Sequence, residues 1–237
     1  MIKFLTAFIF IIISFNSYSA FVLNGTRVVF IGDNKTTSIT VTNKANELYG
    51  GQVWISNLDD DSNKKSNLVY FIPTPTFFKI DSEEKQIIRI MKTDEPLPEE
   101  KESLFWLSVQ ELPPVPDKKN DENVLAIAMN TQIKLLYRPK SIMLDRINAE
   151  KNIIFVVNGN DLIVKNPTPY YFALTELKKG NMNIPLTSSE YQGISEFSPY
   201  SEILIKGKSS FFGQNMSVDA ISDWGGVVNY AVSGINN

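Results

Sequence analysis

The 237-residue chain contains no cysteine and no histidine. These absences exclude a cysteine nucleophile, a Ser–His pair and the common His/Cys zinc sites. An enzyme of this composition would have to work through carboxylates, lysine or tyrosine. Carboxylates are clustered in EEKESLF (99–105), but nothing in the sequence pairs them as a general acid and a general base. We therefore predict that the protein is not an enzyme.

The chain also lacks a strong charge of either sign. The formal net charge is -3 and the pI about 5.2, so no clustered basic surface for nucleic acid is expected. There is no glycine-rich phosphate loop ending in Lys-Ser/Thr. The stretch NLDDDSN (57–63) resembles a calcium loop but lacks its glycine and distal glutamate. We predict no nucleic-acid partner, no cofactor and no metal.

Only the N-terminus carries a long apolar run. Lys3 precedes FLTAFIFIIISF (4–15), and small residues follow at 17–20. This is the layout of a secretory signal peptide, and the run is too short to span a bilayer comfortably. We predict a signal peptide at 1–19 and Ala20 as the first mature residue, with an uncleaved membrane anchor as the alternative. No later segment is apolar enough for membrane insertion of the mature chain, which should lie in an extracytoplasmic space.

After residue 20, short β-branched or aromatic runs alternate with turn segments, as in immunoglobulin-like sandwiches. The first set occupies 27–32, 37–43, 51–57, 69–74, 86–92, 103–112 and 125–137. After RPKSIMLDRINAE (138–150), a second set occupies 152–159, 161–168, 170–180, 201–207 and 227–234. No helical period is found, and GQNMSVD (213–219) is interpreted as a turn. The pattern predicts an all-β protein of two tandem sandwiches, 20–140 and 141–237.

The last run of the first set has large apolar side chains at Leu125, Ile127, Met129 and Ile133, with small or polar residues between them. A period of two predicts a strand with one apolar face. An ordinary core strand shows the same alternation, so the pattern alone does not assign a function to these side chains.

Several motifs, in order along the whole mature chain, resemble the periplasmic chaperones of the chaperone–usher pilus pathway. The most specific is LPEEKESLFWLSVQELPP (97–114), which is similar to the family signature around Glu-Ser-Leu-Phe. It departs from the family at Ser108, where Asn is usual, and at Glu100-Lys101, where Asp-Arg is commoner. The other matching motifs are GTRVVF (25–30), NTQIKLLYRP (130–139), NPTPYY (166–171) and SDWGG (222–226).

The resemblance implies two immunoglobulin-like domains in an L or boomerang arrangement with a cleft between them, in the periplasm. It implies that Leu125, Ile127 and Met129 belong to a donor strand, which the chaperone lends to a pilin subunit lacking one strand. The chaperone would prevent aggregation of the subunit and deliver it to an outer-membrane usher. The free protein is expected as a monomer or with weak self-association. VPDKKNDEN (115–123) is similar to the short-loop branch, and Thr74-Pro75 falls where a cis proline is expected.

The resemblance also implies two charged groups of residues. Arg27 and Lys134 would anchor the C-terminal carboxylate of the subunit through charge-assisted hydrogen bonds. Glu102, Arg138 and Asp223 would form ion pairs that orient the domains. Taken singly, each of these could be a solvated surface charge. Two other functions stay open: a pilus structural subunit or adhesin, and a carboxylate-dependent hydrolase.

Overall fold

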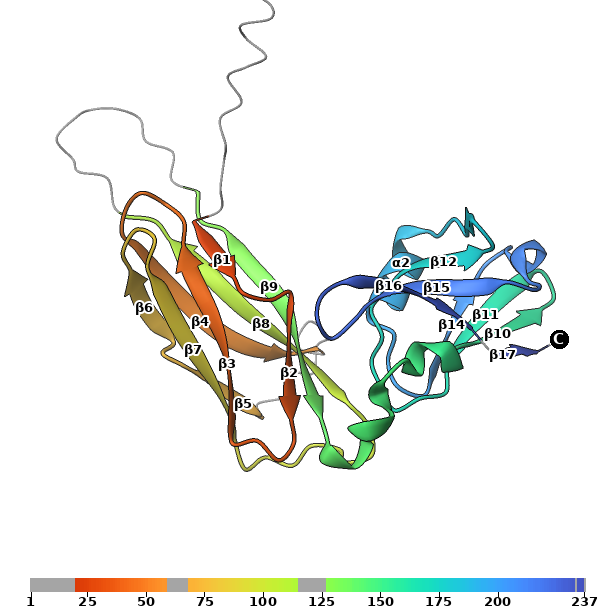
Figure 1. The fold of residues 1–237 in the computed structure, drawn as a ribbon, viewed down its shortest axis with the longest axis horizontal. Coiled ribbons are helices and arrows are strands. Elements are labelled where there is room, and N and C mark those ends of the chain that lie inside the picture. Colours follow the sequence, from red (N-terminus) through yellow and green to blue (C-terminus); the bar gives the residue numbers. More distant parts are fainter. Residues whose placement is uncertain (1–19, 59–67, 115–126, 233, 237) are drawn as a thin grey trace, which may run out of the picture.

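The computed structural model describes residues 20–58, 68–114, 127–232 and 234–236. The predicted signal peptide and Leu125 lie outside these residues. The described chain forms two β domains set at an angle to each other and joined by a short helical linker (Figure 1). The prediction of an all-β protein with two tandem sandwiches is confirmed. Within the described ranges, no helix is long and apolar enough to cross a membrane.

Domain 1 packs two sheets face to face. One has the order β1 (Phe21–Leu23), β3 (Thr36–Asn43), β7 (Lys85–Lys92), β5 (Phe71–Thr74). The other has the order β2 (Arg27–Ile31), β9 (Asn130–Arg138), β8 (Ser103–Leu112), β4 (Tyr49–Asn57), β6 (Phe77–Ile80). Alternate residues of these strands point between the sheets and form one core, which includes Phe30, Val41, Ile88, Leu107 and Leu135. The Thr74–Pro75 bond is cis, as expected.

Domain 2 is a second sandwich with its own core. One sheet has the order β14 (Ser201–Ile205), β11 (Asp161–Asn166), β10 (Ile154–Asn158), β17 (Gly234–Asn236). The other has the order β13 (Met182–Asn183), β12 (Leu174–Lys179), β15 (Met216–Ile221), β16 (Val227–Ala231). The hairpin that joins β15 to β16 points toward domain 1 (Figure 1).

Two expectations for domain 2 were wrong. Residues 213–219 are not simply a turn, because β15 begins at Met216 and Met216, Val218 and Ala220 alternate into the core. The chain also contains an α-helix, α2 (Ser188–Ser195), closed at its start by a capping box between Thr187 and Glu190.

The linker and one loop also form short 3-10 turns. They are η2 (Lys140–Ile142), η3 (Leu144–Arg146), η4 (Ala149–Asn152) and η5 (Ser209–Phe211). The first three carry the chain from β9 into domain 2.

The pairing of β9 differs between its two halves. β2 pairs with β9 in parallel, from Arg27 opposite Lys134 to Ile31 opposite Arg138. β8 pairs with β9 in antiparallel fashion from Asn130 to Tyr137. Residues 130–133 therefore have a strand neighbour on one side only, and their second edge is open within the described part of the chain. Such an edge is a template for another strand.

Candidate functional site

The segment that leads into β9 carries exposed apolar side chains. Ile127 is 66% exposed and Met129 is 49% exposed. The carbonyl of Met129 accepts hydrogen bonds from the backbone N–H of Glu111 (2.8 Å) and from Nε2 of Gln110 (3.0 Å), which ties the segment to β8. The regular strand β9 begins at Asn130, after Ile127 and Met129, and Leu125 lies outside the described residues. An apolar segment thus lies at the open edge of the sheet.

Arg27 and Lys134 lie next to each other on β2 and β9. They are direct partners in the parallel register, so both side chains leave the same face of the sheet. Nη1 of Arg27 donates to the carbonyl of Ile221 at 3.0 Å. Nζ of Lys134 donates to the carbonyl of Ser195 and lies 5.8 Å from the ring centroid of Trp106. The two cations therefore meet at the boundary with domain 2.

Burial disfavours the charged forms of both cations. Burial lowers the pKa of Arg27, although the Asp223 carboxylate opposes the change. Burial also lowers the pKa of Lys134 to about 8; the Glu196 carboxylate opposes this, and the charge of Arg27 adds to it. Nε of Arg27 is buried without a hydrogen-bond partner in the described structure. An added carboxylate beside the pair would favour both charged forms.

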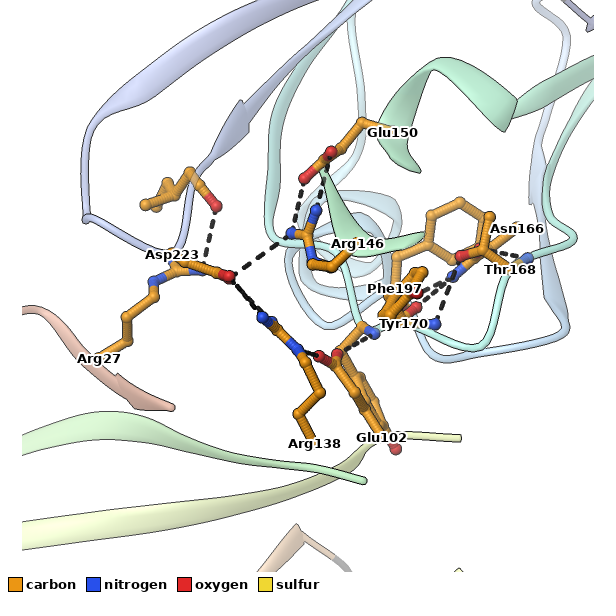
Figure 2. A network of polar contacts seen from close by, with 12 residues as sticks. Arg27, Glu102, Arg138, Arg146, Glu150, Asn166, Thr168, Tyr170, Phe197 and Asp223 are labelled. Carbon is orange, nitrogen blue, oxygen red and sulfur yellow. Dashed lines mark hydrogen bonds and ion pairs between the residues drawn. The ribbon is translucent and has the colours of Figure 1, made fainter. Parts of the chain in front are cut away.

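Glu102, Arg138 and Asp223 are brought together across the domain boundary (Figure 2). Nε of Arg138 donates to Oε1 of Glu102 at 2.5 Å. Its Nη1 and Nη2 donate to Oδ2 and Oδ1 of Asp223 at 2.6 and 3.0 Å. The other oxygen of Glu102 accepts from the N–H of Tyr171 at 2.7 Å. Arg138 and Glu102 belong to domain 1, whereas Asp223 and Tyr171 belong to domain 2.

Two further members of this network were missed in the sequence. Arg146 and Glu150 of the linker form a two-pronged pair with distances of 2.7 and 3.0 Å, and both are buried. Nη2 of Arg146 also lies 3.7 Å from Oδ1 of Asp223. Their contact does not come from a shared helical turn, because Arg146 ends η3 and Glu150 lies in η4, so the spacing of four residues gave no reliable signal. Asp223 thus joins domain 1, the linker and domain 2.

Burial and pairing shift the carboxylates of the network in opposite directions. Burial raises the pKa of Glu102, although Arg138 opposes the change. Burial would also raise the pKa of Asp223, but hydrogen bonds and charge from Arg138, with the charges of Arg146 and Arg27, hold it below its usual value. Asp223 is therefore the firmly ionised member.

A pocket of about 340 Å³ opens over this network. It is lined on one side by Arg138 of domain 1 and on the other by linker and hairpin residues, among them Ile147, Asp223 and Trp224. Trp224 is 97% exposed. The described residues include no cluster of three or more acidic side chains that could hold a metal ion.

Two family models match consecutive parts of the chain. "Pili and flagellar-assembly chaperone, PapD N-terminal domain" matches residues 20–143, and "Pili assembly chaperone PapD, C-terminal domain" matches residues 148–232. Chaperone protein FanE of Escherichia coli is 38% identical over 232 residues, which are 98% of each chain. Chaperone protein FaeE of Escherichia coli is 32% identical over 222 residues, 92% of this chain and 80% of that protein.

Solved structures give the same result. The E. coli chaperone DraB superposes with a TM-score of 0.70 at 25% identity, covering 89% of this chain and 96% of its own. The SafB chaperone of Salmonella enterica, solved in complex with the SafA pilin, shares the fold. That match has a TM-score of 0.72 at 22% identity and covers 91% of this chain and 98% of the other.

Proposed function

Because the chain belongs to the family of pilus-assembly chaperones, we propose that it is a periplasmic chaperone that caps pilin subunits and delivers them to an outer-membrane usher. It binds the subunit by lending it a strand that includes Leu125, Ile127 and Met129. Arg27 and Lys134 hold the C-terminal carboxylate of the subunit. The solved complex of a similar fold with a pilin supports this partner class.

The open edge of β9 supports strand addition. Among the described residues, 130–133 pair with β8 alone, and the exposed residues Ile127 and Met129 precede them. The open edge ends where β2 begins, at the level of Arg27 and Lys134. A guest strand along this edge whose C-terminal carboxylate stops at the two cations must run parallel to β9, in line with β2. Backbone hydrogen bonds then supply affinity that depends little on the guest sequence.

The apolar side chains add to this affinity. Each one that becomes fully buried in the groove of a subunit contributes on the order of 1.5–3 kcal/mol. The flexible side chain of Met129 suits a chaperone that accepts several subunits. The anchor fixes the register, since a slip of one residue would turn the wrong side chains toward the groove.

The ion pairs of Glu102, Arg138 and Asp223 set the angle between the domains. They connect buried or half-buried charges from both domains through short contacts. Removal of one of these charged side chains would leave its partner as an uncompensated charge, which is costly in a buried site. Their role is therefore orientation of the cleft and not direct contact with the subunit.

The juxtaposition of Arg27 and Lys134 at the end of an open edge is the observation that carries this proposal. The test is co-expression of Lys134→Ala with a pilin, followed by purification through a tag on the chaperone. We expect loss of the pilin with unchanged folding of the chaperone. Lys140→Ala is the matched control, because Lys140 is an exposed lysine paired with Asp33 and should retain the pilin. Normal recovery of the pilin with Lys134→Ala contradicts the proposal.

A further inference from the structure

The two anchor cations already have ligands within the protein itself, and both ligands belong to domain 2. Lys134 donates to the carbonyl of Ser195 and Arg27 donates to the carbonyl of Ile221. We propose that these two backbone carbonyls are part of the anchor, and that they hold the ammonium and the guanidinium side by side before a subunit arrives. This inference rests on the proposed function and adds positioning groups to that site.

The Ser195 carbonyl is a suitable ligand for a cation. Ser195 is the last residue of α2, and the last carbonyls of a helix have no partner within the helix. The C-terminal end of a helix also carries partial negative charge, which favours a nearby cation. Lys134, which belongs to domain 1, therefore caps the C-terminal end of α2 in domain 2.

Hydrogen bonds of the surrounding backbone fix the position of the Ile221 carbonyl. Ile221 ends β15, and its N–H donates to the carbonyl of Ala173 at 2.9 Å. Two residues later, Asp223 is fixed by Arg138, and the hairpin is closed by the hydrogen bond from the N–H of Ser222 to the carbonyl of Gly226 at 2.8 Å. The ion network thus sets the position of the carbonyl that holds Arg27.

Both cations keep donors for a subunit. An ammonium has three N–H donors and a guanidinium has five, and the hydrogen bond from each cation to domain 2 uses one of them. A carboxylate can therefore join the site while the carbonyls stay bound. Domain 2 supplies the positioning, and the incoming carboxylate supplies a negative charge that both cations can bind.

The charged groups around Lys134 shift its pKa, so the proposed anchor can be tested through the pH dependence of carboxylate binding. Burial lowers the pKa of Lys134 to about 8, Glu196 at the end of α2 opposes this, and Arg27 on β2 adds to it. Carboxylate binding should therefore weaken as pH rises through about 8, where an ordinary lysine would remain charged. Removal of the Glu196 charge should move this loss to lower pH.

The first experiment compares Glu196→Gln with Glu202→Gln, an exposed glutamate of the same domain paired with Lys165. The probe is a fluorescein-labelled peptide of alternating valine and threonine with a free C-terminal carboxylate, together with its amidated twin. We expect the carboxylate peptide to bind Glu196→Gln roughly threefold more weakly at pH 8. Glu202→Gln should match the parent. Equal pH profiles for the two variants overturn the inference.

The second experiment measures the free protein. Amide hydrogen exchange at the C-terminal end of α2 should be faster in Lys134→Met than in the parent, and unchanged in Lys140→Met. Unchanged exchange in Lys134→Met overturns the positioning role even if the carboxylate peptide binds the parent. If the carboxylate and amidated peptides bind the parent equally at every pH, the proposed anchor itself is wrong, and the inference falls with it.

Discussion

Ile127 and Ile133 lie six residues apart in one segment, yet the exposed fraction of the residue falls from 66% at Ile127 to 7% at Ile133. Ile133 packs in the core of domain 1, whereas Ile127 stands before the first residue of β9. The same kind of side chain is therefore used for folding at one position and is available to a partner at the other.

This difference predicts opposite results for one substitution at two positions. Ile127→Asp should prevent capture of a pilin and change the free energy of unfolding by no more than about 0.5 kcal/mol, because the side chain is exposed. Ile133→Asp should destabilise the free protein by about 3 kcal/mol or more, since it buries an unpaired charge. Urea unfolding and pilin co-purification measure the two effects. A variant Ile127→Asp that binds pilin like the parent counts against the donor strand.

The central position of Asp223 predicts a large effect of Asp223→Ala. The change leaves Arg138 and Arg146 without a shared partner, and we expect a loss of about 3 kcal/mol in the free energy of unfolding. Glu202→Ala, which breaks an exposed pair with Lys165, should cost less than about 1 kcal/mol. Denaturant unfolding of both variants measures the difference. Similar small losses would show that the network does not stabilise the domain arrangement.

The pKa of Lys134 predicts a pH dependence of stability. In the unfolded chain this amine titrates near 10.5, and in the folded protein at about 8. Between these values the unfolded state binds more protons, so the contribution of this group to stability rises with pH from about 8 to 10.5. The full effect is at most on the order of 3 kcal/mol.

The measurement compares the parent with Lys134→Met, which removes the titrating group but keeps an unbranched apolar side chain. Relative to Lys134→Met, the unfolding free energy of the parent should increase as the pH rises from about 8 to 10.5. Near neutral pH, Lys134→Met should be at least as stable as the parent. A constant difference from pH 7 to 10.5 would show that Lys134 titrates normally.

Neighbouring glycines in the hairpin from β15 to β16 give a matched pair. Gly225 has φ +84, and a Cβ there would lie 2.6 Å from Oγ1 of Thr26, next to Arg27. A Cβ at Gly226 meets nothing within 4 Å. We expect Gly225→Ala to cost about 1–2 kcal/mol through backbone strain and to weaken pilin capture, whereas Gly226→Ala should be tolerated. Thermal unfolding and co-purification distinguish them, and equal behaviour contradicts the close approach of the hairpin to domain 1.

The strands of both domains could be predicted because buried side chains alternate along them. Val28 and Phe30 in β2, for example, point into the core and alternate with half-buried neighbours. The residues at which strands begin were harder to predict. Just before β15, Gly213 and Asn215 gave turn signals that concealed the alternation from Met216 onward.

The charged groups needed more than periodicity. Arg27 and Lys134 are far apart in the sequence, and only the resemblance indicated that they meet. The helix α2 had a local signal, because Thr187 with Glu190 is a capping-box spacing. It lies in a short segment without an apolar period, where such a signal is easily overlooked. The Arg146–Glu150 pair had no helical signal, since Arg146 ends η3 and Glu150 lies in η4. The contacts of Lys134 and Arg27 with carbonyls of domain 2 leave no mark in the sequence, since every residue has a carbonyl.

The position of the first residue of β2 has a consequence for where an added strand can end. β2 pairs with β9 from Arg27 onward, so a strand added to the open edge of residues 130–133 could not continue along β9 past Arg27. Under the proposed function, a β2 that began one residue earlier or later would shift the end of the added strand by about 3.3 Å along β9. The binding register would then be set by the C-terminal end of the subunit and not by the sequence that precedes it.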